Sequence, residues 1–142
     1  MRPLPLLRWL LLAGCGVWGF AGDLVVVVNA SSGVERLTRD EVINLFMGRT
    51  RKLATGLTAL PIDQGGTAPD RARFYRALVG KELPEINAYW ARLIFSGQAF
   101  PPRQAESEAE VLEILHNTKG AIAYVDRKLV DRRLRIVFEV GP

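Results

Sequence analysis

Two short polar segments carry the residue types best suited to holding an anion. Asn29-Ala30-Ser31-Ser32-Gly33 offers amide and hydroxyl groups, and Asp63-Gln64-Gly65-Gly66-Thr67-Ala68 leads into a predicted helix. A glycine-rich turn before a helix presents backbone N–H groups and the positive end of the helix dipole to negative charge. These features predict an anion site with Ser31 or Ser32 facing Thr67, and with Arg71 as a charge-assisted partner. The residues of this site would be Asn29, Ser31, Ser32, Gly65, Gly66, Thr67 and Arg71.

Each segment also has a plainer interpretation. Asn and Ser are common turn formers, and a Gly-Gly pair is typical of an ordinary connection between a strand and a helix. Taken from the residues alone, the turn interpretation is favoured for both segments, and the anion site stands as the sharper alternative.

The residue inventory argues against metal and nucleophile chemistry. The chain contains one Cys and one His, which excludes a zinc site of the Cys/His type and any disulfide within the chain. His116 lies near the end of a predicted helix, where a surface or capping role is favoured. We therefore expect no catalytic residues, no metal and no cofactor, and a protein that is not an enzyme.

The N-terminus has the layout of an export signal. Arg2 and Arg8 precede an apolar run of about a dozen residues, shorter than the ~20 that span a bilayer. The small residues Gly19 and Ala21 suit cleavage after Ala21. We expect residues 1–22 to be a cleavable signal peptide and residues 23–142 to form a periplasmic domain. The alternative is a lipid anchor, because Leu12-Ala13-Gly14-Cys15 resembles the lipobox in which the Cys is acylated.

Length and charge limit the remaining classes. A chain of 142 residues with 49% hydrophobic and 24% charged residues suits one globular domain. The formal net charge of +4 is small and spread along the chain, so nucleic acid is not an expected partner. A basic cluster near the C-terminus is interrupted by acids and is interpreted as a solvated face; it comprises Arg127, Lys128, Arg132, Arg133 and Arg135.

Patterning predicts the elements that would position these residues. Four strands are expected at residues 24–28, 58–62, 121–125 and 134–140, the last at a sheet edge. Helices are expected to start at Arg39 behind a Thr38/Glu41 capping box, at Pro69, at Pro84 and after Ser107. The order β-α-β-α-α-α-β-β predicts an α/β fold with a mixed, mostly parallel sheet flanked by helices. In such sheets ligands bind beyond the carboxyl ends of the strands.

Several ordered segments resemble a known family. Leu37-Thr38-Arg39-Asp40-Glu41-Val42, followed by Leu45-Phe46-Met47-Gly48-Arg49, resembles a segment of the phosphate-binding proteins of ABC importers, which are type 2 periplasmic binding proteins. The similarity extends over roughly residues 24–138. It continues through Ala59-Leu60-Pro61-Ile62-Asp63, Arg73-Phe74-Tyr75, Tyr89-Trp90, Phe95-Ser96-Gly97 and Gly120-Ala121-Ile122-Ala123-Tyr124-Val125.

The resemblance implies a fold like one lobe of a type 2 periplasmic binding protein and an exported solute-binding function. The implied ligand is phosphate or a related oxyanion, and the implied partners are a membrane permease or envelope complex and a second copy closing the cleft. The alternative is a non-catalytic envelope interaction module that kept the fold and lost the ligand. The chain has length for about one of the family's two lobes.

The phosphate loop departs from the family pattern. The family reads R-x-D-G-S-G-T, whereas this chain has Pro61 in place of the Arg and Gly65 in place of the Ser. Asp63, Gly66 and Thr67 match the pattern. A cation and a hydroxyl donor are therefore missing from their usual places.

Overall fold

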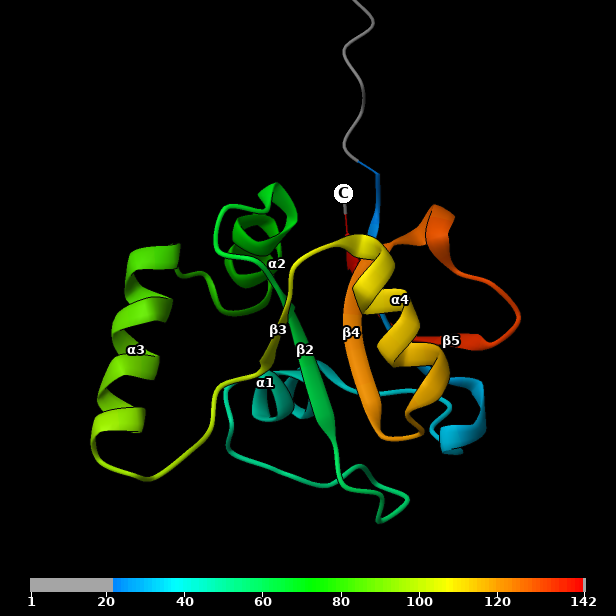
Figure 1. Ribbon diagram of the computed structural model, residues 1–142, viewed down its shortest axis with the longest axis horizontal. Coiled ribbons are helices and arrows are strands. Elements are labelled where there is room, and N and C mark those ends of the chain that lie inside the picture. The colour runs from blue at the N-terminus through cyan, green and yellow to red at the C-terminus, as the bar shows by residue number, and fades with distance from the viewer. Residues whose placement is uncertain (1–21, 142) are drawn as a thin grey trace, which may run out of the picture.

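The computed structural model describes residues 22–141, so the predicted signal peptide and the alternative lipid anchor at Cys15 lie outside the described residues. Its centre is a five-stranded sheet of order β3-β2-β4-β1-β5. The strands are β1 (Leu24–Asn29), β2 (Leu60–Gln64), β3 (Arg103–Ala105), β4 (Ala121–Asp126) and β5 (Leu134–Gly141). Figure 1 shows the sheet with β3 toward one edge and β5 toward the other.

The sheet is mixed, as predicted from the sequence. β2 pairs in parallel with β3 and β4, whereas β1 pairs antiparallel with both β4 and β5. Four of the five strands therefore run in one direction, and β1, an interior strand next to β5, runs against them. β5 lies at an edge, which confirms that prediction.

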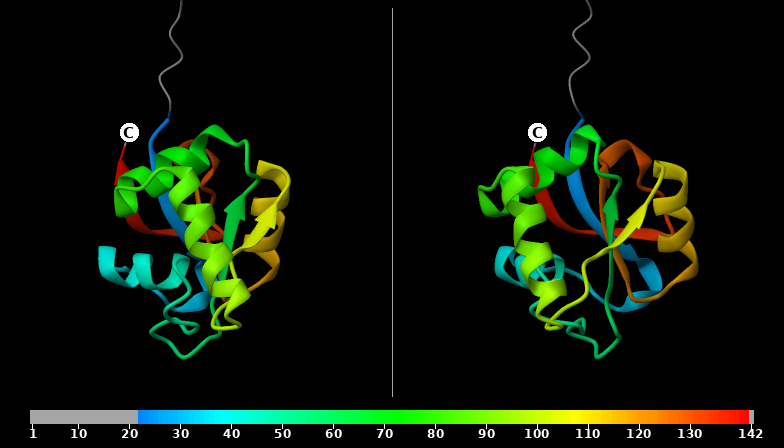
Figure 2. Two further views of the ribbon diagram at one scale, coloured as in Figure 1. Left: turned by 90° about the vertical axis from the view of Figure 1, so that its left-hand side faces the viewer. Right: turned by 60° about the vertical axis from the view of Figure 1, so that its left-hand side comes forward.

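Helices cover both faces of the sheet (Figure 2). One face packs against α1 (Arg39–Phe46), α2 (Pro69–Val79) and α3 (Leu83–Phe95), and the other packs against α4 (Glu108–Asn117). Alternate residues of β1 serve each side: Val26 and Val28 join the first core, and Val25 and Val27 join the second. The continuous valine run is thus explained by a strand that is buried on both faces.

Local signals set the helix starts. The Thr38 side chain accepts from the Glu41 N–H and the Glu41 side chain accepts from the Thr38 N–H, which confirms the capping box of α1. Ser107 caps α4 by accepting from the Glu110 N–H. Here the Glu110 carboxylate accepts from the N–H of Glu106, one residue before the cap, so the second box is not reciprocal.

Two parts of the fold differ from the predictions. The sequence did not predict β3. It is a three-residue edge strand with two exposed polar residues, so it carries no apolar pattern. The second strand starts at Leu60 and not at Thr58, which instead forms an isolated bridge with Lys52.

Candidate functional site

The structure separates the two polar segments that were expected to face each other. Because β1 is antiparallel to β4, Val28 pairs with Ile122 near the start of β4, and β2 starts at that same end of the sheet. The turn at Gly65–Thr67 follows the opposite end of β2. In Figure 1 the short helix at Ala30–Ser32 and the start of α2 lie at opposite ends of the sheet. The expectation that Ser31 or Ser32 lies across from Thr67 is therefore corrected.

The first segment has a structural role. The Asn29 side-chain amide donates to the carbonyls of Leu115 (2.9 Å) and His116 (3.2 Å) in the last turn of α4. Its Oδ1 accepts from the Ser31 N–H at 2.8 Å. The buried Ser32 hydroxyl accepts from the Val34 N–H at 3.2 Å. These bonds satisfy orphan helix carbonyls and a tight turn, as the plainer interpretation held.

The second segment forms an exposed turn at Gly66 and Thr67 before α2. The Ala68 N–H donates to the Gly65 carbonyl at 2.9 Å, and no side chain caps the helix. Asp70 lies in the first turn and pairs with Arg73 at 2.8 Å. This carboxylate uses the favourable end of the helix dipole that an anion would otherwise occupy.

Arg71 lies in the interior, away from the turn where it was expected to assist an anion. Its side chain is 5% exposed, and its Nε donates to Asp63 Oδ2 at 3.1 Å. Its Nη2 donates to Asn87 Oδ1 at 3.3 Å. The physical reason is Asp63, a buried carboxylate on β2 that requires a compensating charge.

Asp63 is saturated by donors. Oδ1 accepts from the Gln64 N–H at 2.9 Å and from the Tyr124 hydroxyl, and Oδ2 accepts from the Tyr75 hydroxyl at 2.9 Å as well as from Arg71. Four bonds fill about all of the lone-pair sites of a carboxylate. Asp63 therefore has no acceptor capacity left for a ligand.

The two phenols remain protonated donors. Burial raises the pKa of Tyr75 well above its ordinary value, and the charge of Asp63 and the hydrogen bond to it raise it further. Burial raises the pKa of Tyr124 in the same way, with the Asp63 charge second. Both phenols are held neutral because ionisation would place a second negative charge beside Asp63 in a dry environment.

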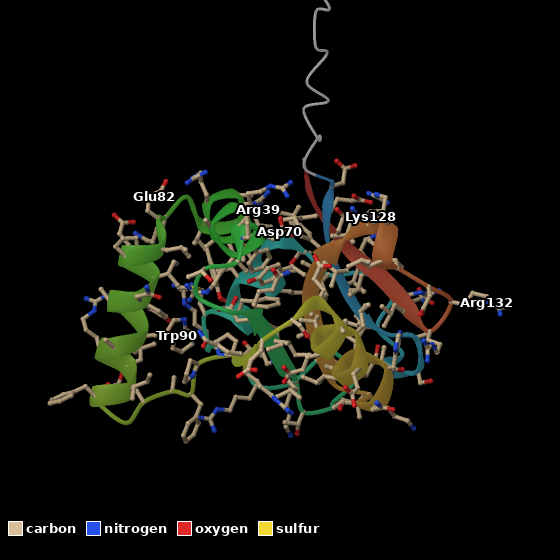
Figure 3. All side chains as sticks on the ribbon, turned by 45° about the horizontal axis from the view of Figure 1, so that its top comes forward. Arg39, Asp70, Glu82, Trp90, Lys128 and Arg132 are labelled. Atoms are coloured by element: carbon tan, nitrogen blue, oxygen red, sulfur yellow. The ribbon has the colours of Figure 1, made fainter. Side chains whose placement is uncertain are left out.

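A cavity of about 380 Å³ opens beside this network, between α3 and the β2–β3 edge. It is lined by Asp63, Arg71, Asn87, Trp90, Ala91, Ile94, Pro101, Pro102 and Gln104. Trp90 is 6% exposed, and its indole Nε1–H is buried without a hydrogen-bond partner. Figure 3 shows Trp90 on the side of α3 that faces the rest of the molecule. This donor is closed to solvent, and its lack of a partner is unusual because a buried polar group normally finds one.

The polar groups available to a ligand in this cavity are mainly donors. The Arg71 Nη1 has no partner among the described residues, the Asn87 Nδ2 is free, and Gln104 lies in register beside Asp63. The arrangement can therefore bind an acceptor-rich or anionic group. Sequence reasoning missed Asn87, Trp90 and Gln104, because Trp90 reads as a core residue and Gln104 lies in the unexpected strand. The residue in the sequence that could have pointed to this site is Asp63, an acid at the end of an apolar strand.

A larger groove of about 660 Å³ lies between α1, α2 and α3. Its charged lining residues are all exposed, namely Arg49, Lys81, Glu85 and Arg92. Its lining includes no buried charge pair such as Asp63–Arg71, so the smaller cavity is the better candidate.

The remaining titratable groups form no second site. His116 Nε2 lies 3.0 Å from Asp131 Oδ2. In residues 22–141, no three His, Cys, Asp or Glu side chains gather as a metal ion would require. Most of the C-terminal basic cluster faces acids, with Arg127 beside Glu139 and Arg133 beside Asp131 at 3.1 Å. Arg132 points outward in Figure 3. Within the same described range, no helix is both long and apolar enough to cross a membrane.

Comparison with known proteins identifies the fold. No protein-family model and no curated protein matches the sequence. Among solved structures, an ABC-type phosphate transport receptor from Vibrio cholerae matches 82% of this chain at 14% identity, with a TM-score of 0.64. PstS from Borrelia burgdorferi matches 82% of this chain at 13% identity, with a TM-score of 0.63. The matches cover 45% and 47% of those two chains. The chain thus spans less than half of their length, and the expected likeness to part of a phosphate-binding protein is confirmed at the level of the fold.

Proposed function

We propose that this chain is a periplasmic solute-binding domain that takes a small anion in the cavity between α3 and the β2–β3 edge. The observation that carries the proposal is the donor set of that cavity. Among the described residues its only carboxylate, Asp63, is already saturated, while Arg71 and Asn87 retain donors. Phosphate belongs to the ligand class considered, in line with the transport receptors that share the fold.

The domain would bind its ligand without transforming it. Fixed donors around an anion suffice for capture, and no general base is needed. The proposed partner is the permease of an ABC importer, reached after export by the N-terminal signal. A second copy or another lobe would cover the open side of the cavity. From one open lobe we expect a dissociation constant between about micromolar and millimolar, because the anion stays partly hydrated.

Titration calorimetry of the purified protein with phosphate and other small anions tests this proposal. Asn87 is exposed, so Asn87→Asp places a negative charge in the cavity with little risk to folding. We expect this variant to bind anions at least about tenfold more weakly. Asn117→Asp is the matched control, because Asn117 is exposed at the end of α4 on the other face of the sheet. No binding at millimolar anion, or equal loss in both variants, would contradict the proposal.

A second function is favoured by a separate observation at the end of α3. Ile94, Phe95 and Phe100 are 54%, 97% and 78% exposed. Residues 86–105 contain no acid, while Arg92 and Arg103 are exposed, and the Arg51 guanidinium lies 5.3 Å from the Phe100 ring centroid. An apolar, basic surface suits an acidic protein partner. Under this alternative the chain is an envelope interaction module.

The two functions separate in one experiment. Substituting Phe95→Ser together with Phe100→Ser should leave anion affinity unchanged if solute binding is the function. The same pair should abolish co-purification of an envelope partner if the interaction module is correct. Neither side chain lines the cavity, so each readout reports on one function only.

A further inference from the structure

The cavity beside Asp63 and Arg71 has a polar half and an apolar half. The polar half holds Asp63, Arg71, Asn87 and Gln104. The apolar half holds Ala91, Ile94, Pro101 and Pro102, with the Trp90 ring also in the wall. An inorganic anion would make no favourable contact with the apolar half, because each of its oxygens requires a hydrogen-bond donor. The inference drawn below rests on the proposed function and concerns the class of anion.

The volume of the cavity exceeds what a bare oxyanion fills. About 380 Å³ corresponds to the liquid volume of about a dozen water molecules at ~30 Å³ each. A tetrahedral oxyanion has five heavy atoms and would leave most of that space to water. Cavities of about 300 Å³ and above are typical of organic ligands.

The charge balance favours a singly charged ligand. Among residues 22–141, Arg71 is the only cation lining the cavity, and the Asp63 carboxylate already faces it at 3.1 Å. The pair is neutral as a whole, so the site has no excess positive charge to offset a dianion. A monoanion can be held mainly by hydrogen-bond donors, and Arg71 and Asn87 retain such donors in the cavity.

The geometry of Arg71 favours a planar head group. Its Nε–H is bonded to Asp63 and one Nη2–H is bonded to Asn87 Oδ1, which leaves Nη1 and the second Nη2–H. Two parallel N–H groups match the two oxygens of a carboxylate. The Asn87 Nδ2 supplies a further donor in the same wall.

We infer that the cavity binds an organic monocarboxylate with an apolar body, with the carboxylate at Arg71 and the body against Ile94 and the two prolines. This assignment gives a role to the Ile94 side chain, which is 54% exposed. A bound apolar body covers that side chain and removes its apolar surface from water. It also explains why a proline pair follows a loop at this position, since Pro101 and Pro102 form a stiff apolar wall.

Calorimetric titration at constant ionic strength, with phosphate, acetate and hexanoate as probes, tests the inference. Hexanoate adds four methylene groups to acetate, and each one that is buried should tighten binding about fourfold. We expect hexanoate to bind at least tenfold tighter than both acetate and phosphate. Phosphate binding as tightly as hexanoate would overturn the inference while leaving the proposed function standing. Absence of binding for all three probes would overturn both.

Two neighbouring variants locate the apolar half. Ile94→Ala should weaken hexanoate binding about three- to tenfold and leave acetate binding unchanged. Phe95→Ala is the matched control, because Phe95 is the adjacent residue, is more exposed and does not line the cavity. Both side chains are exposed, so neither change should unfold the protein. Equal hexanoate affinity in the wild type and in Ile94→Ala would overturn the placement, and with it the inference.

Discussion

The Asp63 carboxylate organises the interior at the scale of single residues. It faces one guanidinium, two phenols and a backbone N–H inside an otherwise apolar core. The aromatic rings around it are closely packed, with Phe74 stacked on Tyr124 at a centroid distance of 4.0 Å. The network therefore links β2, α2 and β4 through buried groups, and each member depends on the others.

Removing the negative charge of Asp63 should lower the unfolding free energy substantially. Asp63→Asn leaves Arg71 buried without an anion, and breaking such a pair costs about 3–5 kcal/mol of unfolding free energy. Urea unfolding measures the change. Asp70→Asn is the control, since its pair with Arg73 is partly exposed and should contribute less than about 1 kcal/mol. Similar losses in the two variants would show that Asp63 is not the centre of a buried network.

The same network predicts loss of stability in alkali. The pKa values of Tyr75 and Tyr124 are higher in the folded protein than their ordinary value of 10.0. The stabilisation is therefore fully present below about pH 10 and is lost as pH rises above it. We expect the unfolding free energy to fall from about pH 10 upward, measured by urea titration across that range. Tyr124→Phe removes one of the two groups and should flatten the fall; an unchanged slope would contradict the assignment.

At the scale of elements, close backbone approach explains how β2 and β4 pair. The Leu60 N–H donates to the Gly120 carbonyl at 2.8 Å where the two strands begin. A Cβ at position 120 would lie 2.0 Å from the Thr58 carbonyl oxygen. Only glycine fits there without a shift of the backbone.

Gly120→Ala should therefore destabilise the protein at or above the upper end of the ~1–3 kcal/mol typical of overpacking. Gly66→Ala is the control, because no atom lies within 4 Å of a Cβ at that position. The control should stay within about 0.5 kcal/mol of the wild type. Thermal or urea unfolding compares them, and equal stability of the two variants would contradict the close approach.

Elements with strong local signals were predictable from the sequence. The valine run, the Thr38/Glu41 box and the proline at the start of α2 each act over a few residues, and each predicted its element. β3 was missed because its stabilisation comes from pairing with β2 and not from its own residues. The candidate site depends on the direction of β1 in the sheet and on the burial of the Arg71 side chain against Asp63. Neither follows from local pattern, so the sequence alone pointed to a site that the fold does not assemble.

At the scale of the whole molecule, the described chain forms one layered unit with two cores. Each face of the sheet is covered by helices, and the cores meet only through the strands. Each solved structure compared has more than twice the extent of the matched region. The proposal that a second lobe covers the cavity, from another chain or from another copy, concerns this additional extent.

Export can be checked directly on the whole protein. We expect the secreted form to begin at Gly22 or Asp23, because Gly19 and Ala21 suit a signal peptidase. Intact mass spectrometry of the protein recovered from the periplasm measures this. A mass that starts at Cys15 and includes acyl chains would show that the lipid-anchored alternative is correct.

The position of β1 has a consequence for the order of folding. The first strand of the chain lies inside the sheet, and its two partners are β4 and β5, the last strands of the chain. The sheet therefore closes only after nearly the whole polypeptide is available, and such long-range pairings make folding slow. Until then, the residues of β4 and β5 are missing from both cores. A polypeptide that cannot close its sheet early stays extended long enough to be threaded through a membrane pore, which suits a protein that is predicted to be exported.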